Sequence, residues 1–280
     1  MTVEVRVQDR RDELTATERR LAEVVLAEPQ TVAFGTVASF ARAAETSGAS
    51  VVRFANHLGY DGFIELQAAV QEELAGHLRP AVERIRQPAH DDLVGRTLAV
   101  ELENITSSLE AIDRRTLSAA TARLANPSAR VVVLPGSASF GVGYHLADQL
   151  GLLRDGVSLA WGSPAPVTAA LASLKRTDVV IAIDVRRYDV AVLDGASLAT
   201  KRGVPLIAIT DSALSPLARR ATATFTIAGE GAGPFDSQTG ALAVANTLVT
   251  AVAQRLRASA TRRLDRVEQA WRAAGVLTDS

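Results

Sequence analysis

Residues 36–59 read TVASFARAAETSGASVVRFANHLG, and this stretch has the pattern of two short helices joined by a polar turn. In the first half, apolar residues recur at i, i+3, i+4 and i+7 from Val37, which places one apolar stripe on a helix. Ser47 is suited to cap a second helix that begins near Gly48, and Gly59 is suited to end it. The pattern predicts a helix-turn-helix whose second helix can enter the major groove of DNA.

The predicted outer face of the second helix carries polar side chains that can hydrogen-bond base edges and phosphates, without an acidic residue among them. The residues predicted to contact DNA are Ser47, Ser50, Arg53, Asn56 and His57. The residues predicted to point inward are Val51, Val52, Phe54, Ala55 and Leu58. The alternative is a purely structural helix pair, because amphipathic helices with short turns are common in helical domains.

Two runs, VVRF at 51–54 and LGYDGF at 58–63, resemble the helix-turn-helix of the RpiR family of bacterial transcription regulators. Members of that family also carry a C-terminal sugar isomerase (SIS) domain. The resemblance therefore implies the same organisation over nearly the whole chain. Glu45 stands where the family usually has a glycine in the turn, so we expect a positive φ at Glu45 and a strained or reshaped turn.

The composition excludes several classes of protein. At 280 residues with 48% hydrophobic side chains, the chain is long enough for two domains with apolar cores. It has no cysteine, which excludes disulfides, thiolate metal sites and cysteine nucleophiles, and favours a reducing compartment. The N-terminal residues lack the apolar core of a signal peptide, and no apolar run approaches the length of a membrane span. We expect a cytoplasmic protein that does not contact membranes.

The net charge of −1 is unusual for a DNA-binding protein. Residues 1–78 contain seven Arg against twelve Asp and Glu, a local balance of −5. Counterion release from a single reading helix is therefore expected to contribute little affinity. The sequence predicts at least a homodimer, or a higher homo-oligomer, that places two reading helices on one double-stranded operator.

Three regions are expected along the chain. Residues 1–78 are predicted to form the helix-turn-helix DNA-binding domain, with helices at 15–28 and 63–78 around the motif. Residues 79–127 are predicted to hold a hinge, marked by Pro80 and Pro88, and the linking helices 93–112 and 117–124. Residues 128–280 are predicted to form the SIS effector-binding domain.

In that last region, short apolar runs alternate with helix-forming segments. The runs are residues 130–134, 157–161, 179–183, 205–209 and 223–227. The helical segments are residues 144–153, 167–174, 190–202, 214–220, 238–257 and 259–273. Buried strands that alternate with helices predict a three-layer α/β domain with a five-stranded parallel, flavodoxin-like sheet behind an all-α N-terminal domain.

A ligand site is expected beyond the carboxyl ends of the first and third strands, where the strand order of such a sheet reverses. The residues expected to bind the effector are Ser137, Ser139, Arg186, Arg187, Thr210 and Ser212. Hydroxyls and amides at a helix N-terminus, together with guanidinium groups, favour a small anion such as a sugar phosphate or sugar acid. Two points oppose this expectation. Ser137 and Ser139 can act simply as helix caps, and Asp184 repels an anion unless it is neutralised or bonds to ligand hydroxyls.

In one loop, the sequence differs from the pattern of the family that it resembles. Many SIS domains that bind sugar phosphates have a Ser-x-Ser-Gly-x-Thr loop after the third strand, which residues 184–189 do not preserve. The alternative function is an SIS-type sugar-phosphate isomerase with an accessory helical domain, which needs a catalytic base. The candidates are His145 and Glu230, each without an evident partner in the sequence. We therefore predict a transcription regulator, with no catalytic residue, cofactor or metal site.

Overall fold

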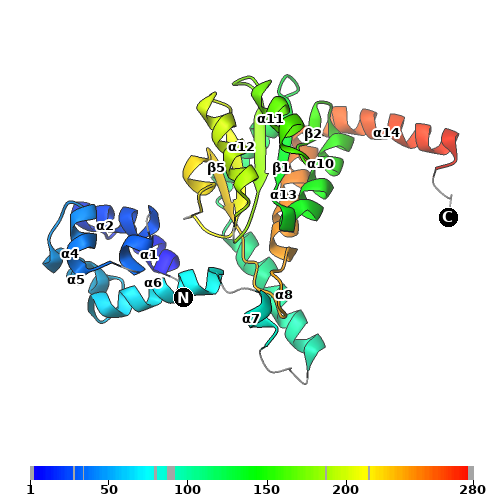
Figure 1. Cartoon of the computed structure of the whole chain (residues 1–280). Helices are drawn as coiled ribbons and strands as arrows, with labels where there is room; N and C mark the ends of the chain where they lie inside the picture. The colour runs from blue at the N-terminus through cyan, green and yellow to red at the C-terminus, as the bar shows by residue number, and fades with distance from the viewer. Residues whose placement is uncertain are drawn as a thin grey trace. The chain divides into compact units, whose positions relative to one another are not determined.

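The computed structural model describes residues 3–27, 29–33, 35–78, 81–86, 92–186, 188–213 and 215–276. The chain divides into two compact units, Met1–Glu83 and Arg84–Ser280 (Figure 1). The predicted helix-turn-helix lies in the first unit and the predicted sheet in the second. Pro80 and Pro88, which mark the predicted hinge, lie outside the described residues.

The described part of the first unit is helical. Its helices are α1 Val3–Asp9, α2 Ala16–Ala27, α3 Pro29–Ala33, α4 Val37–Ala43, α5 Gly48–His57, α6 Gly62–Leu78 and α7 Ala81–Arg84, the last ending at the first residue of the second unit. At the start of α2, Thr15 N donates to Glu18 Oε2 at 2.9 Å and Glu18 N donates to Thr15 Oγ1 at 3.3 Å. This reciprocal capping box agrees with the sequence pattern. Helix α1 was not anticipated from the sequence.

Three phenylalanines join the helices of the first unit in one apolar core. The ring centroid of Phe40 on α4 lies 6.5 Å from that of Phe54 on α5 and 6.1 Å from that of Phe63 on α6. Phe40 and Phe54 are fully buried, so the core fixes α5 against the preceding helix. The inward placement predicted for Val52 is wrong, because its side chain is 40% exposed.

The second unit contains one parallel sheet. Its strands are β1 Val131–Pro135, β2 Val157–Leu159, β3 Val179–Ile183, β4 Leu206–Thr210 and β5 Ala223–Thr226. The strand order is β2-β1-β3-β4-β5, the flavodoxin-like order expected from the sequence. Val131 is in register with Val179, and Pro135 with Ile183. The carboxyl ends of β1 and β3 are therefore adjacent. This is the point at which the order of strands in the sheet reverses.

Helices cover both faces of this sheet. One face is covered by α9 Arg114–Leu124, α10 Phe140–Leu153 and α13 Thr239–Arg255, and the other by α11 Pro164–Ala172 and α12 Val190–Lys201. Two further helices, α8 Leu93–Glu110 and α14 Arg257–Ala274, pack mainly against the covering helices. The helix predicted at 214–220 is wrong, because the described part of that segment holds only the 3-10 turn η2 Ala218–Arg220. Pro216 disfavours helical backbone at the residue before it, and seven residues are too few to form a stable helix without strong packing.

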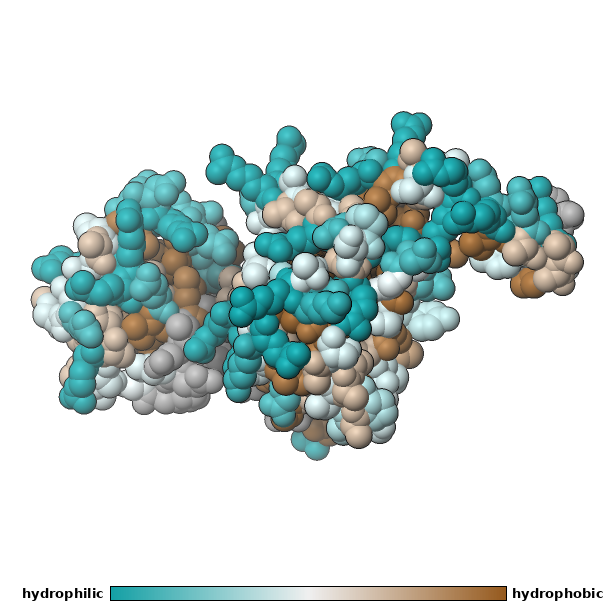
Figure 2. Space-filling model, turned by 90° about the horizontal axis from the view of Figure 1, so that it is seen from above, coloured by the Kyte–Doolittle hydropathy of each residue, from teal (hydrophilic) through white to brown (hydrophobic). Residues whose placement is uncertain are grey.

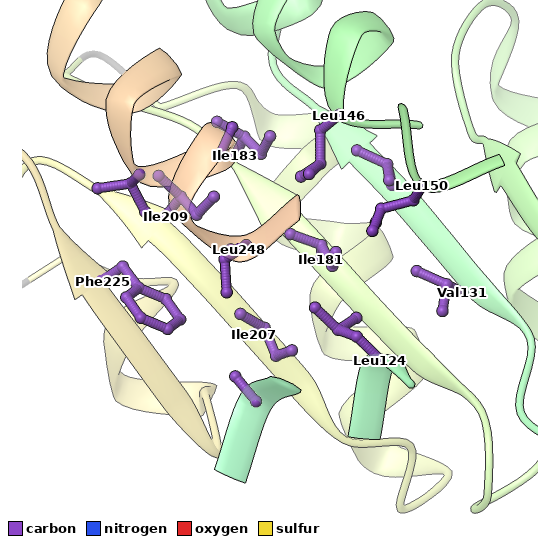
Figure 3. Close-up of a cluster of buried hydrophobic side chains, with 14 of the residues drawn as sticks. Leu124, Val131, Leu146, Leu150, Ile181, Ile183, Ile207, Ile209, Phe225 and Leu248 are labelled. Carbon is purple, nitrogen blue, oxygen red and sulfur yellow. The ribbon is translucent and has the colours of Figure 1, made fainter. Parts of the chain in front are cut away.

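Alternation along the strands divides the apolar residues between two cores. Val131 and Val133 face one core with α9, α10 and α13, whereas Val132 and Leu134 face the other with α11 and α12. In the first core, Leu146 and Leu150 of α10 and Leu248 of α13 lie over the strands (Figure 3). The result is the three-layer domain predicted from the alternating pattern.

The outer surface is mainly polar on the face seen in Figure 2, with apolar residues showing mostly in recesses. Helix α14 extends from the sheet domain (Figure 1). Arg263 holds it to α10 by donating from Nε to Gly151 O at 3.0 Å. Across the described part of the chain, no helix has both the length and the apolar stretch required to cross a bilayer.

Candidate functional site

The turn of the helix-turn-helix is built around Glu45. Its φ is +50°, the positive value expected where the family usually has glycine. The turn is closed by a hydrogen bond from Thr46 N to Ala41 O at 2.8 Å. Ser47 then caps α5, its Oγ accepting a hydrogen bond from Ser50 N at 3.3 Å. Helix α5 therefore begins after a strained turn residue, Glu45, and an N-cap, Ser47.

The five predicted DNA contacts are placed differently. Ser47, Arg53 and Asn56 are exposed, whereas Ser50 is 8% exposed and His57 is half-buried. Arg53 Nη2 donates to Ser50 Oγ at 3.1 Å, which holds the guanidinium near the start of α5. Ser50 thus supports Arg53, and the predicted contact of Ser50 with DNA stays a prediction.

His57 is tied to the first unit instead of pointing freely outward. Its Nδ1 lies 3.0 Å from Glu18 Oε1, and its Nε2 lies 3.8 Å from Glu13 Oε2. Burial tends to raise the pKa of Glu18, but hydrogen bonds from Thr15 and His57 outweigh it and lower the pKa. Asn56 also has an internal role, because its Oδ1 accepts a hydrogen bond from Gly62 N at 2.9 Å. These contacts fix the end of α5 to α2 and α6.

Sequence reasoning missed two features of α5. Ala49 and Val52 are exposed on its outer side beside Arg53, where small apolar groups can contact a thymine methyl. The helical period would have identified Val52, since it lies off the stripe of Val51 and Phe54. The second feature is Arg6 of α1, whose Nη1 donates to the carbonyls of both residues that follow α5, at 3.0 Å each.

The second candidate site lies at the carboxyl edge of the sheet, where β1 and β3 end side by side. Gly136 N donates to Ile183 O at 2.8 Å. A Cβ on Gly136 would lie 2.3 Å from Asp184 Oδ1, so this position requires glycine. The predicted loops after the two strands are thus in direct contact, with the Asp184 carboxylate packed against the loop after β1.

Asp184 is a buried carboxyl group at this edge. It is 3% exposed and accepts hydrogen bonds from Val185 N at 3.0 Å and Asp189 N at 2.6 Å. Burial raises its pKa to about 6, the nearby charges of Asp189 and Asp211 add to the rise, and the two amides oppose it. The group is therefore close to half-protonated near pH 6.

Of the hydroxyl groups predicted to bind the effector, some donate hydrogen bonds to carboxylates of the protein and others are buried. Ser137 Oγ donates to Asp189 Oδ2 at 3.0 Å, and Asp189 Oδ1 caps α12 by accepting from Ala191 N at 3.0 Å. Thr210 is fully buried, and its Oγ1 donates to Asp211 Oδ1 at 3.3 Å. Ser139 is fully buried, and its Oγ has no hydrogen-bond partner within the described structure. Ser212 is 7% exposed.

Arg186, directly beyond β3, has a φ of +36°, outside the usual range for a residue with a side chain. Its amide donates to Asp211 Oδ2 at 3.1 Å. Its guanidinium pairs with Glu230 and, at 3.0 Å, with Asp236, both in the loop after β5. Arg187 lies outside the described residues. In the described contacts, Arg186 is not joined to the serines of the loop after β1.

Comparisons with known proteins match each unit separately. The model "Helix-turn-helix domain, rpiR family" matches residues 1–77, and the model "SIS domain" matches residues 124–251. The sugar isomerase domain of an RpiR transcription factor from Sphaerobacter thermophilus is 31% identical. The match covers 62% of this chain and 97% of that one, with a TM-score of 0.58. The chain belongs to the RpiR family of transcription regulators.

Two further proteins align with nearly the whole chain. An HTH-type transcriptional regulator of Caldanaerobacter subterraneus, itself uncharacterised, is 26% identical over 89% of this chain and 89% of its own length. The structure of Vibrio vulnificus NanR complexed with ManNAc-6P is 21% identical and covers 99% of this chain and 100% of that chain, with a TM-score of 0.59. At that identity, the likeness to NanR shows the fold alone.

The two candidate bases of an isomerase are both engaged in this RpiR-family chain. His145 Nε2 lies 2.8 Å from Asn246 Oδ1 on α13, which orients the ring between two helices. Glu230 pairs with Arg186. In the portion of the chain that the structure describes, no group of three or more His, Cys, Asp or Glu side chains is arranged to hold a metal ion.

Proposed function

We propose that this protein is a transcription regulator in which α5 reads an operator and the SIS domain senses a small sugar-derived anion. The observation that carries the first half is the capped, exposed outer side of α5, where Arg53 is held by Ser50. RpiR-family membership supplies the function class, a DNA-binding regulator with an SIS domain. The protein is proposed to act in the cytoplasm, without catalysing a reaction.

The proposed effector site is the carboxyl edge of the sheet. Its candidate ligands lie at or just beyond the ends of β1, β3 and β4. They are Ser137, Ser139, Arg186, Arg187, Thr210 and Ser212. Ligands of open parallel sheets bind at such an edge. NanR, which shares the fold, is described in complex with ManNAc-6P, and this supports a phosphorylated sugar or sugar acid as the class to test first.

The carboxylates at this edge favour a ligand with several hydroxyl groups. Asp184, Asp189 and Asp211 can accept hydrogen bonds from a sugar, whereas they repel an anion placed directly beside them. The anionic group of the ligand is therefore expected to lie on the side of Arg186, and the sugar hydroxyls on the side of Asp184.

A homodimer is proposed to form through α8. Leu98, Leu102, Ile105 and Leu109 follow the 4-3-4 spacing of a helix-pairing seam. Leu98 is 59% exposed and Leu102 is 54% exposed, whereas Asn104 and Ser108 on the same helix are buried in their own domain. A helix that buries polar side chains and exposes leucines requires an apolar partner, and a second copy provides an identical seam.

Two measurements test this function. Selection from random duplex DNA by the full-length protein should enrich a sequence made of two related half-sites. A thermal-shift screen should then find stabilisation by a sugar phosphate or sugar acid that also changes operator affinity. Turnover of any sugar phosphate in the screen, or failure to enrich a DNA sequence, would overturn the proposal.

A further inference from the structure

Arg186 is the centre of a cluster of four charges beyond the strand ends. One oxygen, Asp236 Oδ1, accepts from Arg186 Nη1 at 3.0 Å and from Arg84 Nη1 at 2.6 Å. Arg186 Nη2 also pairs with Glu230 Oε2. Two guanidinium groups thus face two carboxylates, and the cluster as a whole is neutral.

The four members differ sharply in exposure. The side chains of Arg186, Arg84 and Asp236 are 16%, 17% and 19% exposed. The side chain of Glu230 is 68% exposed. An ion pair with one partner in solvent contributes little to stability, because water solvates the exposed charge almost as well. Glu230 is therefore the member that can leave at least cost. Its departure would leave Arg186 Nη2 without a carboxylate, while Asp236 stays on Nη1 and Asp211 on the Arg186 amide.

The backbone of Glu230 is held independently of its side chain. Glu230 N donates to Asn104 Oδ1 at 3.1 Å, and Glu230 O accepts from Asn104 Nδ2 at 2.7 Å. Asn104 lies on α8 and is 1% exposed. Because both backbone groups are fixed to a buried amide, the carboxylate of Glu230 can swing off Arg186 while the loop stays in place.

The backbone of Arg186 is strained at the same position. Its φ of +36° persists because the Asp211 carboxylate holds its amide while Asp236 holds its side chain. Strain of this kind is concentrated at ligand sites, where the surrounding contacts compensate for it. It also fixes the direction of the guanidinium, whose fork suits a carboxylate or a phosphate equally.

We propose that Glu230 is a built-in substitute for the anionic group of the effector. In the unliganded protein it occupies Arg186. A polyhydroxylated metabolite with a carboxylate or phosphate displaces it, placing that group on Arg186 and its hydroxyls toward Asp211 and Asp184. This inference rests on the proposed effector site and adds to it the residue that the ligand must replace.

Displacement of Glu230 also alters the surroundings of Arg84. Arg84 shares Asp236 Oδ1 with Arg186, and it is the residue at which the second compact unit begins. An anion that draws Arg186 toward itself weakens its hold on Asp236 and leaves that oxygen to Arg84. Effector binding therefore changes the contacts of Arg84, the residue at which the chain enters the second unit.

The test compares the full-length protein with Glu230→Gln, Arg186→Gln and a matched control, Glu110→Gln, which changes an exposed carboxylate at the end of α8. Isothermal titration with inorganic phosphate, gluconate and glucose measures affinity for two anions and a neutral sugar. Glu230→Gln should bind phosphate and gluconate at least tenfold more tightly than the wild type, with glucose unchanged. Glu110→Gln should match the wild type, and Arg186→Gln should lose the anion response. Circular dichroism confirms that each variant is folded.

The outcomes separate this inference from the proposed function. If wild-type protein binds anions through Arg186 but Glu230→Gln binds them no more tightly, the effector site stands and the role of Glu230 is wrong. A double variant, Glu230→Gln with Arg186→Gln, should lose the tighter binding; if it keeps that gain, the displacement mechanism is also wrong. If no variant binds an anion, both the anion site and the substitution by Glu230 are overturned.

Discussion

Arg53 is the single side chain on which we expect operator recognition to depend most. It is exposed on α5, and Ser50 Oγ holds its guanidinium at 3.1 Å. Arg53→Ala should lower operator affinity by about 1 to 3 kcal/mol, the range for an arginine that contacts a base or phosphate. Gel-shift titration measures the change. Arg202→Ala, which removes an exposed arginine from the second unit, should leave affinity unchanged.

The guanidinium of Arg53 donates to Ser50 Oγ and not to an acidic residue of the turn, so Arg53→Ala is expected to fold normally. Circular dichroism and denaturation of the same preparation check this. A folded variant with wild-type operator affinity would remove Arg53 from the reading surface and leave Asn56 as the main polar candidate.

Asp184 should make stability depend on pH in an unusual direction. Its pKa rises from 3.8 in the unfolded chain to about 6 in the folded protein, because the carboxyl group is buried. Between these values the folded state binds more protons than the unfolded state, so the free energy of unfolding falls as pH rises. The loss should total about 3 kcal/mol by pH 6.5, from 1.36 kcal/mol per pKa unit.

Urea denaturation of wild type and Asp184→Asn at pH 4 and pH 6.5 measures this effect. The variant cannot titrate at this position, so its stability relative to the wild type should improve at the higher pH. Asp148→Asn, at an exposed position on α10, is the control and should show no such trend. Parallel pH profiles for wild type and Asp184→Asn would show that Asp184 keeps an ordinary pKa.

Some single-residue features were predictable from the sequence and others were not. The positive φ of Glu45 followed from the family pattern, and the cap at Ser47 from its residue type. The role of His57 did not, because the contact with Glu18 joins residues 39 positions apart. The pairing of Arg186 with Glu230 spans 44 positions and likewise has no local signal.

At the scale of elements, the reading helix depends on α1 for the position of its C-terminal end. Arg6 donates to Leu58 O and Gly59 O and lies 4.4 Å from the ring centroid of Tyr60. Arg6→Ala should lower the stability of the helix-turn-helix unit by about 1 to 3 kcal/mol, through lost hydrogen bonds and the lost cation–π contact.

Denaturation followed by circular dichroism measures this loss, with Arg11→Ala as the matched control at an exposed position. The expected pattern is a lower transition midpoint for Arg6→Ala and an unchanged one for Arg11→Ala. Equal midpoints for both variants would mean that α1 does not support α5.

The element order was largely predictable because buried parallel strands are continuous apolar runs. Five such runs predicted five strands, and the topology rules for open sheets predicted their order. Helix α1 was missed because it is short and its buried apolar residues, Val3 and Val7, give only one repeat. The helix prediction for residues 214–220 was wrong for the opposite reason: the composition favours a helix, but Pro216 prevents one.

At the scale of the whole molecule, charge and symmetry act together. The acidic first unit is expected to gain little from phosphate contacts, so we propose that useful operator affinity depends on two reading helices on one duplex. Sequence reasoning led to this requirement from the count of charges alone. It could not point to the proposed pairing surface, since the exposure of Leu98 and Leu102 depends on which face of α8 packs against the loop after β5.

Replacement of two seam leucines provides the decisive measurement on assembly. Leu98→Asp with Leu102→Asp places two charges in the proposed seam, where pairing would bury them unpaired. Both leucines are more than half exposed in the single chain, so the fold should survive. Light scattering at micromolar concentration should show a dimer or higher oligomer for the wild type and a monomer for the variant. Operator affinity should fall about 100-fold or more, because each half-site is then bound by a separate monomer.

The control is Val190→Asp, which also changes an exposed apolar residue and should keep the wild-type assembly. A variant that stays oligomeric would place the interface elsewhere, and a monomeric variant with undiminished operator affinity would contradict the need for paired reading helices.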